Sequence, residues 1–336
     1  MAAGGAVRGG VVPVLAAACL WGTVGPAQLL AEAAVDPVAL GACRMLLGGA
    51  VLCAVAVRPA GLRTLWRRGA RAWVLLSVAV TAVFQAAFLP AVDRTGAAVA
   101  TAVAFGSVPA VAGPCARLVQ GDRLGGPWWA GTGFAVAGIG LLLLPGSSGR
   151  TDLVGVLLAA VAGASFGVYI VAGKRLAAAG ADAGAAAPVS VLGAGLLVAP
   201  WIAVAPAGLG SVRALVLIGW LALATTAVGY LLFTQGAQRI SAATTGTLSL
   251  AEPLVAALLG VLLLGERLGG WAALGTALLL GGLVVVSVPV RGRARVAAGA
   301  AGAVVGQEPG GDATARAAAA GVATARAPGE GGQRSR

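Results

Sequence analysis

The chain has 336 residues, of which 59% are hydrophobic and only 10% are charged, and its formal net charge at pH 7 is +12. A water-soluble protein needs more polar surface than this composition offers, so the composition excludes a soluble enzyme or a soluble binding domain. The positive charge does not indicate nucleic-acid binding, because the arginines are dispersed between apolar runs and form no basic stripe on a soluble domain.

Apolar stretches of about 20 residues follow one another along the chain, and a helix of that length crosses the hydrocarbon of a bilayer, which is ~30 Å thick. The sequence therefore predicts an all-α integral membrane protein with ten transmembrane helices. Their cores are expected at residues 11–30, 38–57, 72–91, 97–118 and 128–144, and then at 153–172, 188–205, 214–233, 242–264 and 271–288.

The distribution of arginine and lysine predicts how these helices are oriented. With the N-terminus inside, the inner connections hold most of the basic residues, and the outer ones hold Arg94, Arg150, Arg213 and Arg267. This is the positive-inside pattern, so both termini are expected in the cytoplasm. We expect residues 1–10 to form a cytoplasmic N-terminus and residues 291–336, which lack aromatic side chains, to form a disordered cytoplasmic tail.

The two halves of the chain resemble each other. Residues 121–126 (GDRLGG) recur as residues 265–270 (GERLGG), and an offset of 145 residues aligns Trp21 with Phe166, Thr81 with Thr226 and Gln85 with Tyr230. After a one-residue slip the offset is 144, which aligns Gly131 with Gly275 and Gly138 with Gly282. Each half, residues 11–145 and 146–290, holds five predicted spans. Because five is odd, the two repeats are expected to be inverted, as in many secondary transporters.

Several short motifs also carry a resemblance to a known family. They are residues 85–88 (QAAF), 94–101 (RTGAAVAT) and 121–124 (GDRL) in the first half, and 250–253 (LAEP) and 265–268 (GERL) in the second. In order and spacing they resemble the EamA-type members of the drug/metabolite transporter superfamily. The resemblance implies ten helices in two inverted five-helix repeats around a central cavity, which move small metabolites, often outward. It does not imply one particular substrate.

Two charged residues lie well inside predicted spans, where a charge is costly unless it is paired or faces water. Glu252 shares a helix face with Thr245 and Ser249, at spacings of i, i+4 and i+7, and precedes Pro253, which loosens the helix. Glu252 is interpreted either as a protonation site or cation partner, or as a structural acceptor paired with Arg44 or a backbone N–H. Arg44 is interpreted either as a site for an anionic group or as an anchor that extends to the membrane interface.

Aromatic residues make up only 5% of the chain, so those inside the spans are informative. We expect them to line a cavity and stack on an apolar or aromatic substrate, although packing against helices or lipid is an equally good interpretation of each one. The candidate substrate-binding residues are Trp21, Arg44, Gln85, Phe88, Thr101, Tyr169, Tyr230, Thr245 and Ser249, and the candidate coupling residue is Glu252.

The sequence thus predicts a secondary transporter in a bacterial cell membrane that exports small metabolites or drug-like compounds, with amino acids as one class of substrate and proton coupling as an open question. Two other classes stay open: a membrane-embedded enzyme acting on a lipid-linked substrate, which the absence of histidine disfavours, and a passive channel. The four cysteines have no metal-ligand spacing, so no metal or cofactor is expected. The expected partners are a small-molecule substrate and the lipid bilayer, without nucleic acid, and a homodimer is left open.

Overall fold

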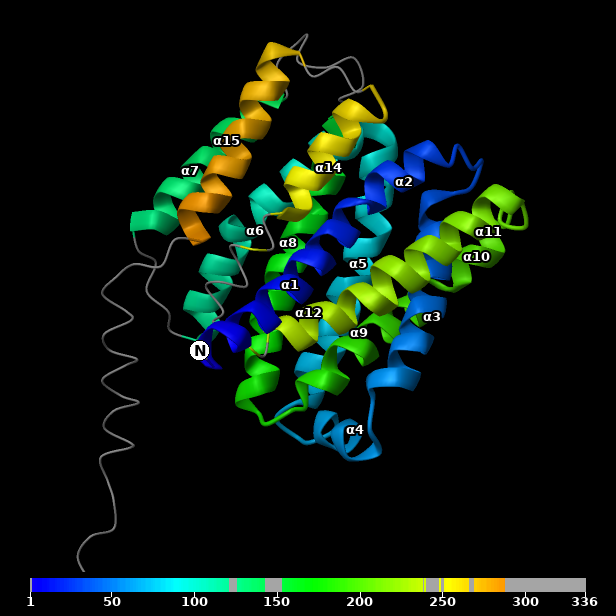
Figure 1. Cartoon of the computed structure of the whole chain (residues 1–336), viewed down its shortest axis with the longest axis vertical. Coiled ribbons are helices and arrows are strands. Elements are labelled where there is room, and N and C mark those ends of the chain that lie inside the picture. The colour runs from blue at the N-terminus through cyan, green and yellow to red at the C-terminus, as the bar shows by residue number, and fades with distance from the viewer. Residues whose placement is uncertain are drawn as a thin grey trace, which may run out of the picture. The chain divides into compact units, whose positions relative to one another are not determined.

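The computed structural model describes residues 2–120, 126–142, 153–237, 239, 248, 251–265 and 269–287. These residues form helices that are joined by turns and short loops, without a strand among them (Figure 1). The helices are α1 (Ala2–Gly22), α2 (Val24–Leu30), α3 (Pro37–Ala56), α4 (Pro59–Leu65), α5 (Arg71–Thr95), α6 (Ala97–Gln120), α7 (Gly126–Leu142), α8 (Leu153–Ala178), α9 (Ala183–Val198), α10 (Pro200–Val204), α11 (Val212–Gly219), the π-helix η1 (Trp220–Val228), α12 (Gly229–Ala237), α14 (Ala251–Leu262) and α15 (Gly270–Ser287).

Seven helical segments among the described residues are long and apolar enough to cross a membrane. They are Gly10–Leu30, Pro37–Ala56, Arg71–Thr95, Ala97–Val119, Leu153–Ala178, Gly184–Val204 and Val212–Gly236, and each overlaps one of the predicted spans. The other three predicted spans, 128–144, 242–264 and 271–288, are described only in part, as α7, α14 and α15. The chain is therefore a multi-pass helical membrane protein. The predicted disordered tail, 291–336, lies outside the described residues.

Proline and capping residues explain where several helices begin and break. The first predicted span is divided at Thr23, because Pro26 has no N–H to donate and its ring clashes with the carbonyl four residues earlier, at Gly22. Pro200 divides α9 from α10 in the same way. Helix α3 begins after Asp36, whose carboxylate accepts hydrogen bonds of 2.9 Å from the backbone N–H groups of Val38 and Ala39.

The eighth predicted span contains an irregularity that hydropathy does not reveal. Between α11 and α12 the chain winds as a π-helix over Trp220–Val228, and the Thr226 hydroxyl donates to the carbonyl of Leu221, five residues earlier, at 2.8 Å. Single turns of π-helix inside longer helices often occur at functional sites. Trp21 of α1 donates its indole N–H to the carbonyl of Thr225 within this segment, at 2.8 Å.

Helices α7 and α15 lie side by side (Figure 1) and contact each other reciprocally through glycines. A Cβ atom placed on Gly138 would lie 2.7 Å from the carbonyl oxygen of Gly275, and a Cβ atom on Gly282 would lie 2.7 Å from the carbonyl oxygen of Gly131. These four glycines are two pairs of repeat-equivalent residues. Such a contact, in which each partner presents the same surface to the other, is what a two-fold axis produces.

The same reciprocity recurs at a second place where the two halves meet. A Cβ atom on Gly22 of α1 would lie 2.8 Å from the carbonyl oxygen of Glu252 in α14, and one on its repeat equivalent, Gly167 of α8, would lie 3.1 Å from that of Val108 in α6. Val108 is in turn the repeat equivalent of Glu252. Small residues let the helices approach closely at these points, which brings α1 and α8 inward to the centre of the bundle.

Candidate functional site

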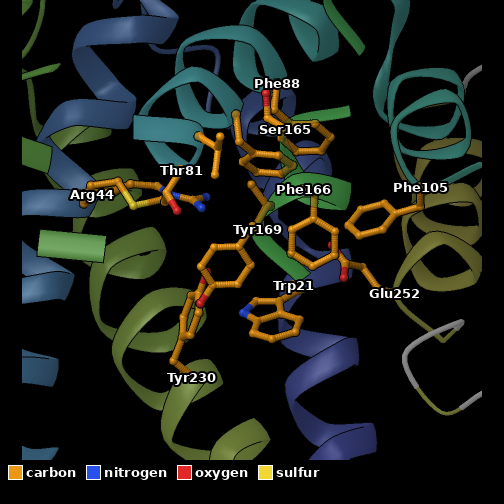
Figure 2. A pocket seen from close by; sticks show the side chains of 14 residues that line it. Trp21, Arg44, Thr81, Phe88, Phe105, Ser165, Phe166, Tyr169, Tyr230 and Glu252 are labelled. Carbon is orange, nitrogen blue, oxygen red and sulfur yellow. The ribbon is translucent and has the colours of Figure 1, made fainter. Parts of the chain in front are cut away.

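A cavity lies between helices of the two halves (Figure 2). Helices α1, α2, α3, α5 and α6 contribute lining residues from the first half, and α8, α12 and α14 contribute them from the second. The lining residues are Trp21, Val24, Arg44, Met45, Val80, Thr81, Phe84, Phe88, Phe105, Ser165, Phe166, Tyr169, Tyr230 and Glu252. Mostly apolar walls with a few polar groups are typical of small-molecule sites.

Arg44 lies on α3, two turns from the Asp36 cap, and its guanidinium points into the cavity (Figure 2). The residue is 7% exposed, and its Nε and Nη1 atoms have no hydrogen-bond partner within the described part of the chain. The side chain thus does not extend to the surface as an anchor would. A buried guanidinium with free donors is prepared to bind a carboxylate, because its planar fork matches the two carboxylate oxygens.

Glu252 lies on α14 and is 8% exposed. Figure 2 shows it across the cavity from Arg44, with the rings of Phe166 and Tyr169 between them in this view. The two side chains form no salt bridge in the described structure. The structural interpretation in which Glu252 pairs with Arg44 is therefore not what this conformation shows. Each charge is free to meet a charge of the opposite sign on a bound solute.

Aromatic rings make up much of the cavity wall. Phe166 is the centre of one cluster: its ring centroid lies 6.0 Å from those of Phe84 and Tyr169, and 5.7 Å from that of Phe105. Trp21 is the centre of a second, with Tyr230 edge-on at 5.3 Å and Phe233 at 5.1 Å. Trp21 and Phe166 are repeat equivalents, so each half supplies one central ring. Such surfaces can stack on an apolar or aromatic side chain of a solute.

The hydroxyl groups of the lining are bonded to their own helices. Thr81 donates to the carbonyl of Ser77 at 2.7 Å, and Ser165 donates to the carbonyl of Val161 at 2.9 Å. Both residues keep free lone pairs, so they can accept hydrogen bonds from a solute but their protons are already used. In the described residues no three His, Cys, Asp or Glu side chains cluster in a way that could hold a metal ion.

Six of the ten residues predicted from the sequence line this cavity: Trp21, Arg44, Phe88, Tyr169, Tyr230 and Glu252. Gln85 and Thr101 do not line it and are 1% and 2% exposed. Gln85 faces α3 at Gly41, because a helix places consecutive residues about 100° apart and the neighbouring Phe84 takes the cavity face. Thr245 and Ser249 lie outside the described residues.

Other lining residues were not among the candidates. Thr81 precedes the candidate Phe88 by seven residues, and Ser165 precedes the candidate Tyr169 by four, so each shares a helix face with a candidate residue. That spacing could have found them. Phe105 follows the candidate Thr101 by four residues and so has the same spacing, although Thr101 itself does not line the cavity.

Comparison with known proteins identifies the family of the chain. The profile of the EamA-like transporter family matches the chain twice, at residues 8–144 and 153–288. An uncharacterized transporter of Bacillus subtilis strain 168, YwfM, is 38% identical over 289 residues, which cover 83% of this chain and 93% of that protein. An uncharacterized protein of Pseudomonas aeruginosa PAO1, PA1977, is 33% identical over 274 residues, which cover 79% of this chain and 89% of that protein.

A solved crystal structure shows a related fold. It covers 82% of this chain and 95% of its own, with a TM-score of 0.58 and 23% sequence identity, so the likeness concerns the fold alone. The family match spans both halves of the chain and nearly all of its described helices. The chain therefore belongs to the EamA-like transporter family and carries two EamA domains.

Proposed function

We propose that the protein is a secondary active transporter that carries small zwitterionic solutes, such as amino acids with apolar or aromatic side chains. The observation that supports this substrate class is a cavity whose wall holds Arg44 and Glu252 together with several aromatic rings. A carboxylate would bind the guanidinium and an ammonium group would bind the carboxylate, while the apolar part of the solute stacks on the rings. An uncharged solute would leave both buried charges unpaired, which is unfavourable.

The proposed architecture is ten transmembrane helices in two inverted five-helix repeats, with both termini inside. The reciprocal glycine contacts of α7 with α15 support it, because Gly138 near the end of one helix meets Gly275 near the start of the other. The two equivalent helices thus run antiparallel across the contact, as inverted repeats require. Such repeats give two related conformations, one open to each side, with the solute held between the halves.

Within this proposal, Glu252 couples transport to protons. It is the one carboxyl group among the described residues of the cavity wall. Its repeat equivalent is Val108, so the acid belongs to one half only and is not part of the shared helical framework. A buried acid in a membrane protein is commonly part of a proton path or a solute site. The cell membrane of a bacterium is the proposed location, and export is the direction that the family resemblance favours.

Reconstitution of wild-type protein and Glu252→Gln in proteoliposomes tests the proposal. A mixed pool of amino acids, nucleosides and cationic dyes is presented with and without a pH gradient, and uptake is measured by mass spectrometry. We expect gradient-dependent accumulation of amino acids by the wild-type protein. In the variant this accumulation is lost, while exchange of solute across the membrane without a gradient is retained at higher solute concentrations, because glutamine binds the ammonium group more weakly than a carboxylate does.

The matched control is Glu32→Gln, which changes an acid whose side chain is 80% exposed and lies near Arg213, away from the cavity lining. This variant should accumulate solutes as the wild type does. Equal accumulation by wild type and Glu252→Gln would reject proton coupling at Glu252. Uptake no greater than in empty liposomes for every compound would reject the proposed substrate class.

A further inference from the structure

Gln85 is a buried polar residue that this conformation leaves unsatisfied. It is 1% exposed, and neither its amide nitrogen nor its amide oxygen has a hydrogen-bond partner within the described residues. Its amide group packs against Gly41 of α3, where a Cβ atom would collide with it. Buried amide groups in native proteins are nearly always paired, so a glutamine with both amide atoms unpaired needs an explanation.

The internal repeat supplies an explanation for the unpaired amide of Gln85. Gln85 on α5 and Tyr230 on α12 occupy the same position in the two halves, at an offset of 145 residues. Tyr230 lines the cavity, whereas Gln85 is withdrawn from it. In a transporter built from inverted repeats, the two repeats differ in structure within one conformation. In the opposite conformation each repeat takes the structure that the other had. When the halves exchange arrangements, Gln85 takes the surroundings that Tyr230 has here, and Tyr230 takes those of Gln85.

We infer that Gln85 is a solute-binding residue of the opposite conformation, in which its amide enters the cavity as Tyr230 leaves it. The inference rests on the proposed function, because it requires alternating access. It explains why a residue that costs stability here lies on the helix that supplies four cavity residues, Val80, Thr81, Phe84 and Phe88. The solute-binding group that it provides is an amide, which both donates and accepts hydrogen bonds and suits the polar end of a zwitterion.

When the two repeats exchange arrangements, some residues should keep the same surroundings, and these residues provide controls. Trp21 and Phe166 are equivalent and both line the cavity here, so they should line it in both conformations. Ser77 lies two turns before Gln85 on α5 and is 0% exposed, and its equivalent, Ala222, is also 0% exposed. Position 77 should therefore be buried in both conformations.

Cysteine accessibility tests the inference in the full-length protein. Single cysteines are introduced as Gln85→Cys, Tyr230→Cys and Ser77→Cys into a chain whose native Cys19, Cys43, Cys53 and Cys115 are replaced by alanine. Each variant in proteoliposomes is treated with a small membrane-permeant maleimide, with and without saturating leucine or phenylalanine and with pH gradients of either sign. The rate of modification is measured by mass spectrometry.

We expect the rates at positions 85 and 230 to change in opposite directions, by about fivefold or more, so that a condition that exposes one protects the other. Position 77 should stay unreactive. Gln85→Leu keeps the size of the side chain and removes the amide. This variant should transport about five- to tenfold more slowly than the wild type, because the opposite conformation loses a group that hydrogen-bonds the solute. Its melting temperature should not be lower, because the present conformation loses only an unsatisfied amide group.

Any other pattern overturns the inference. If position 85 is unreactive under every condition, or if its rate follows that of position 230, Gln85 does not enter the cavity. If Gln85→Leu lowers the melting temperature and leaves transport unchanged, a bound water satisfies the amide and its role is structural. Failure of the proposed function is a separate result, because wild-type protein would then show no exchange of solute between the two sides.

Discussion

At the scale of single residues, Arg44 and Glu252 distinguish this cavity from a gap between helices. The repeat equivalent of Glu252 is Val108, and that of Arg44 is Ser190, because the caps Asp36 and Asp182 of α3 and α9 are 146 residues apart. Neither charge is therefore needed to build the five-helix unit. Each is buried without a salt bridge to the other in the described structure, an arrangement that is unfavourable for an empty site and favourable once a solute of complementary charge is present.

Replacing Arg44 by glutamine should discriminate between solutes by their carboxylate. We expect Arg44→Gln to weaken binding of phenylalanine by ~10- to 100-fold, the loss of a charged hydrogen bond worth about 1.5–3 kcal/mol. Binding of phenethylamine, which lacks the carboxylate, should not weaken. Arg44→Lys should be intermediate, because a point charge does not reproduce the two parallel bonds of the guanidinium. Competition against labelled solute in proteoliposomes measures both affinities.

Arg213→Gln is the matched control, since the Arg213 side chain is 70% exposed and contacts only Glu32 among its described charged neighbours, at 3.9 Å. It should bind both solutes as the wild type does. An equal loss for phenylalanine and phenethylamine in Arg44→Gln would contradict a carboxylate site, because it would show that the arginine supports the cavity as a whole.

Much of this wall could be predicted residue by residue. Charged and aromatic side chains inside apolar spans are expensive or scarce, and six such candidates do line the cavity, although their role in binding stays a prediction. The prediction was less effective where the type of residue does not indicate whether its side chain faces the cavity. Gln85 and Phe84 are neighbours in sequence, and only the packing of α5 against α3 and α8 decides which of them faces inward.

At the scale of helices, the close contact of α7 with α15 depends on glycine. A side chain at Gly138 meets the backbone of α15, which cannot move aside, whereas no atom of the described residues lies within 4 Å of a Cβ atom at Gly140, two residues further on. The same contrast holds on the partner helix: a Cβ atom at Gly282 would meet the backbone of α7, whereas one at Gly281 would have no described atom within 4 Å.

Gly138→Leu should therefore destabilise the protein, and Gly140→Leu should not. Overpacking of a tight contact costs about 1–3 kcal/mol, so we expect a clearly lower melting temperature for Gly138→Leu in detergent, measured by thermal denaturation. Gly282→Leu and Gly281→Leu should repeat the result on the other helix. Equal melting temperatures within each pair would show that these helices are not held by the contact described.

Helices were easier to predict than their interruptions. Continuous apolar runs predict spans because hydrocarbon requires about 20 apolar residues, and the seven long helices follow those runs. The π-helix over Trp220–Val228 leaves no trace in hydropathy, since it changes the winding and not the polarity of the chain. The short helix α4 connects two spans and is too short and too exposed to give an apolar signal.

At the scale of the whole molecule, inverted repeats make a prediction that parallel repeats do not: equivalent residues must face opposite sides of the membrane. Two exposed pairs can report this. Glu32 is equivalent to Ala177, and Arg68 is equivalent to Arg213, each at an offset of 145 residues, and all four positions are exposed. With the N-terminus inside, positions 32 and 213 lie outside, and positions 68 and 177 lie inside.

Single cysteines at these four positions, in the chain without native cysteines, can be labelled in intact cells with a membrane-impermeant maleimide. We expect labelling of Glu32→Cys and Arg213→Cys in intact cells, and labelling of Arg68→Cys and Ala177→Cys only after the cells are permeabilised. Repeats of the same orientation would instead label both members of a pair from the same side. Because the two members of each pair are compared with each other, the experiment tests the inversion whichever side the termini lie on. If both termini lie outside, all four labelling results reverse together, and only the positive-inside assignment is wrong.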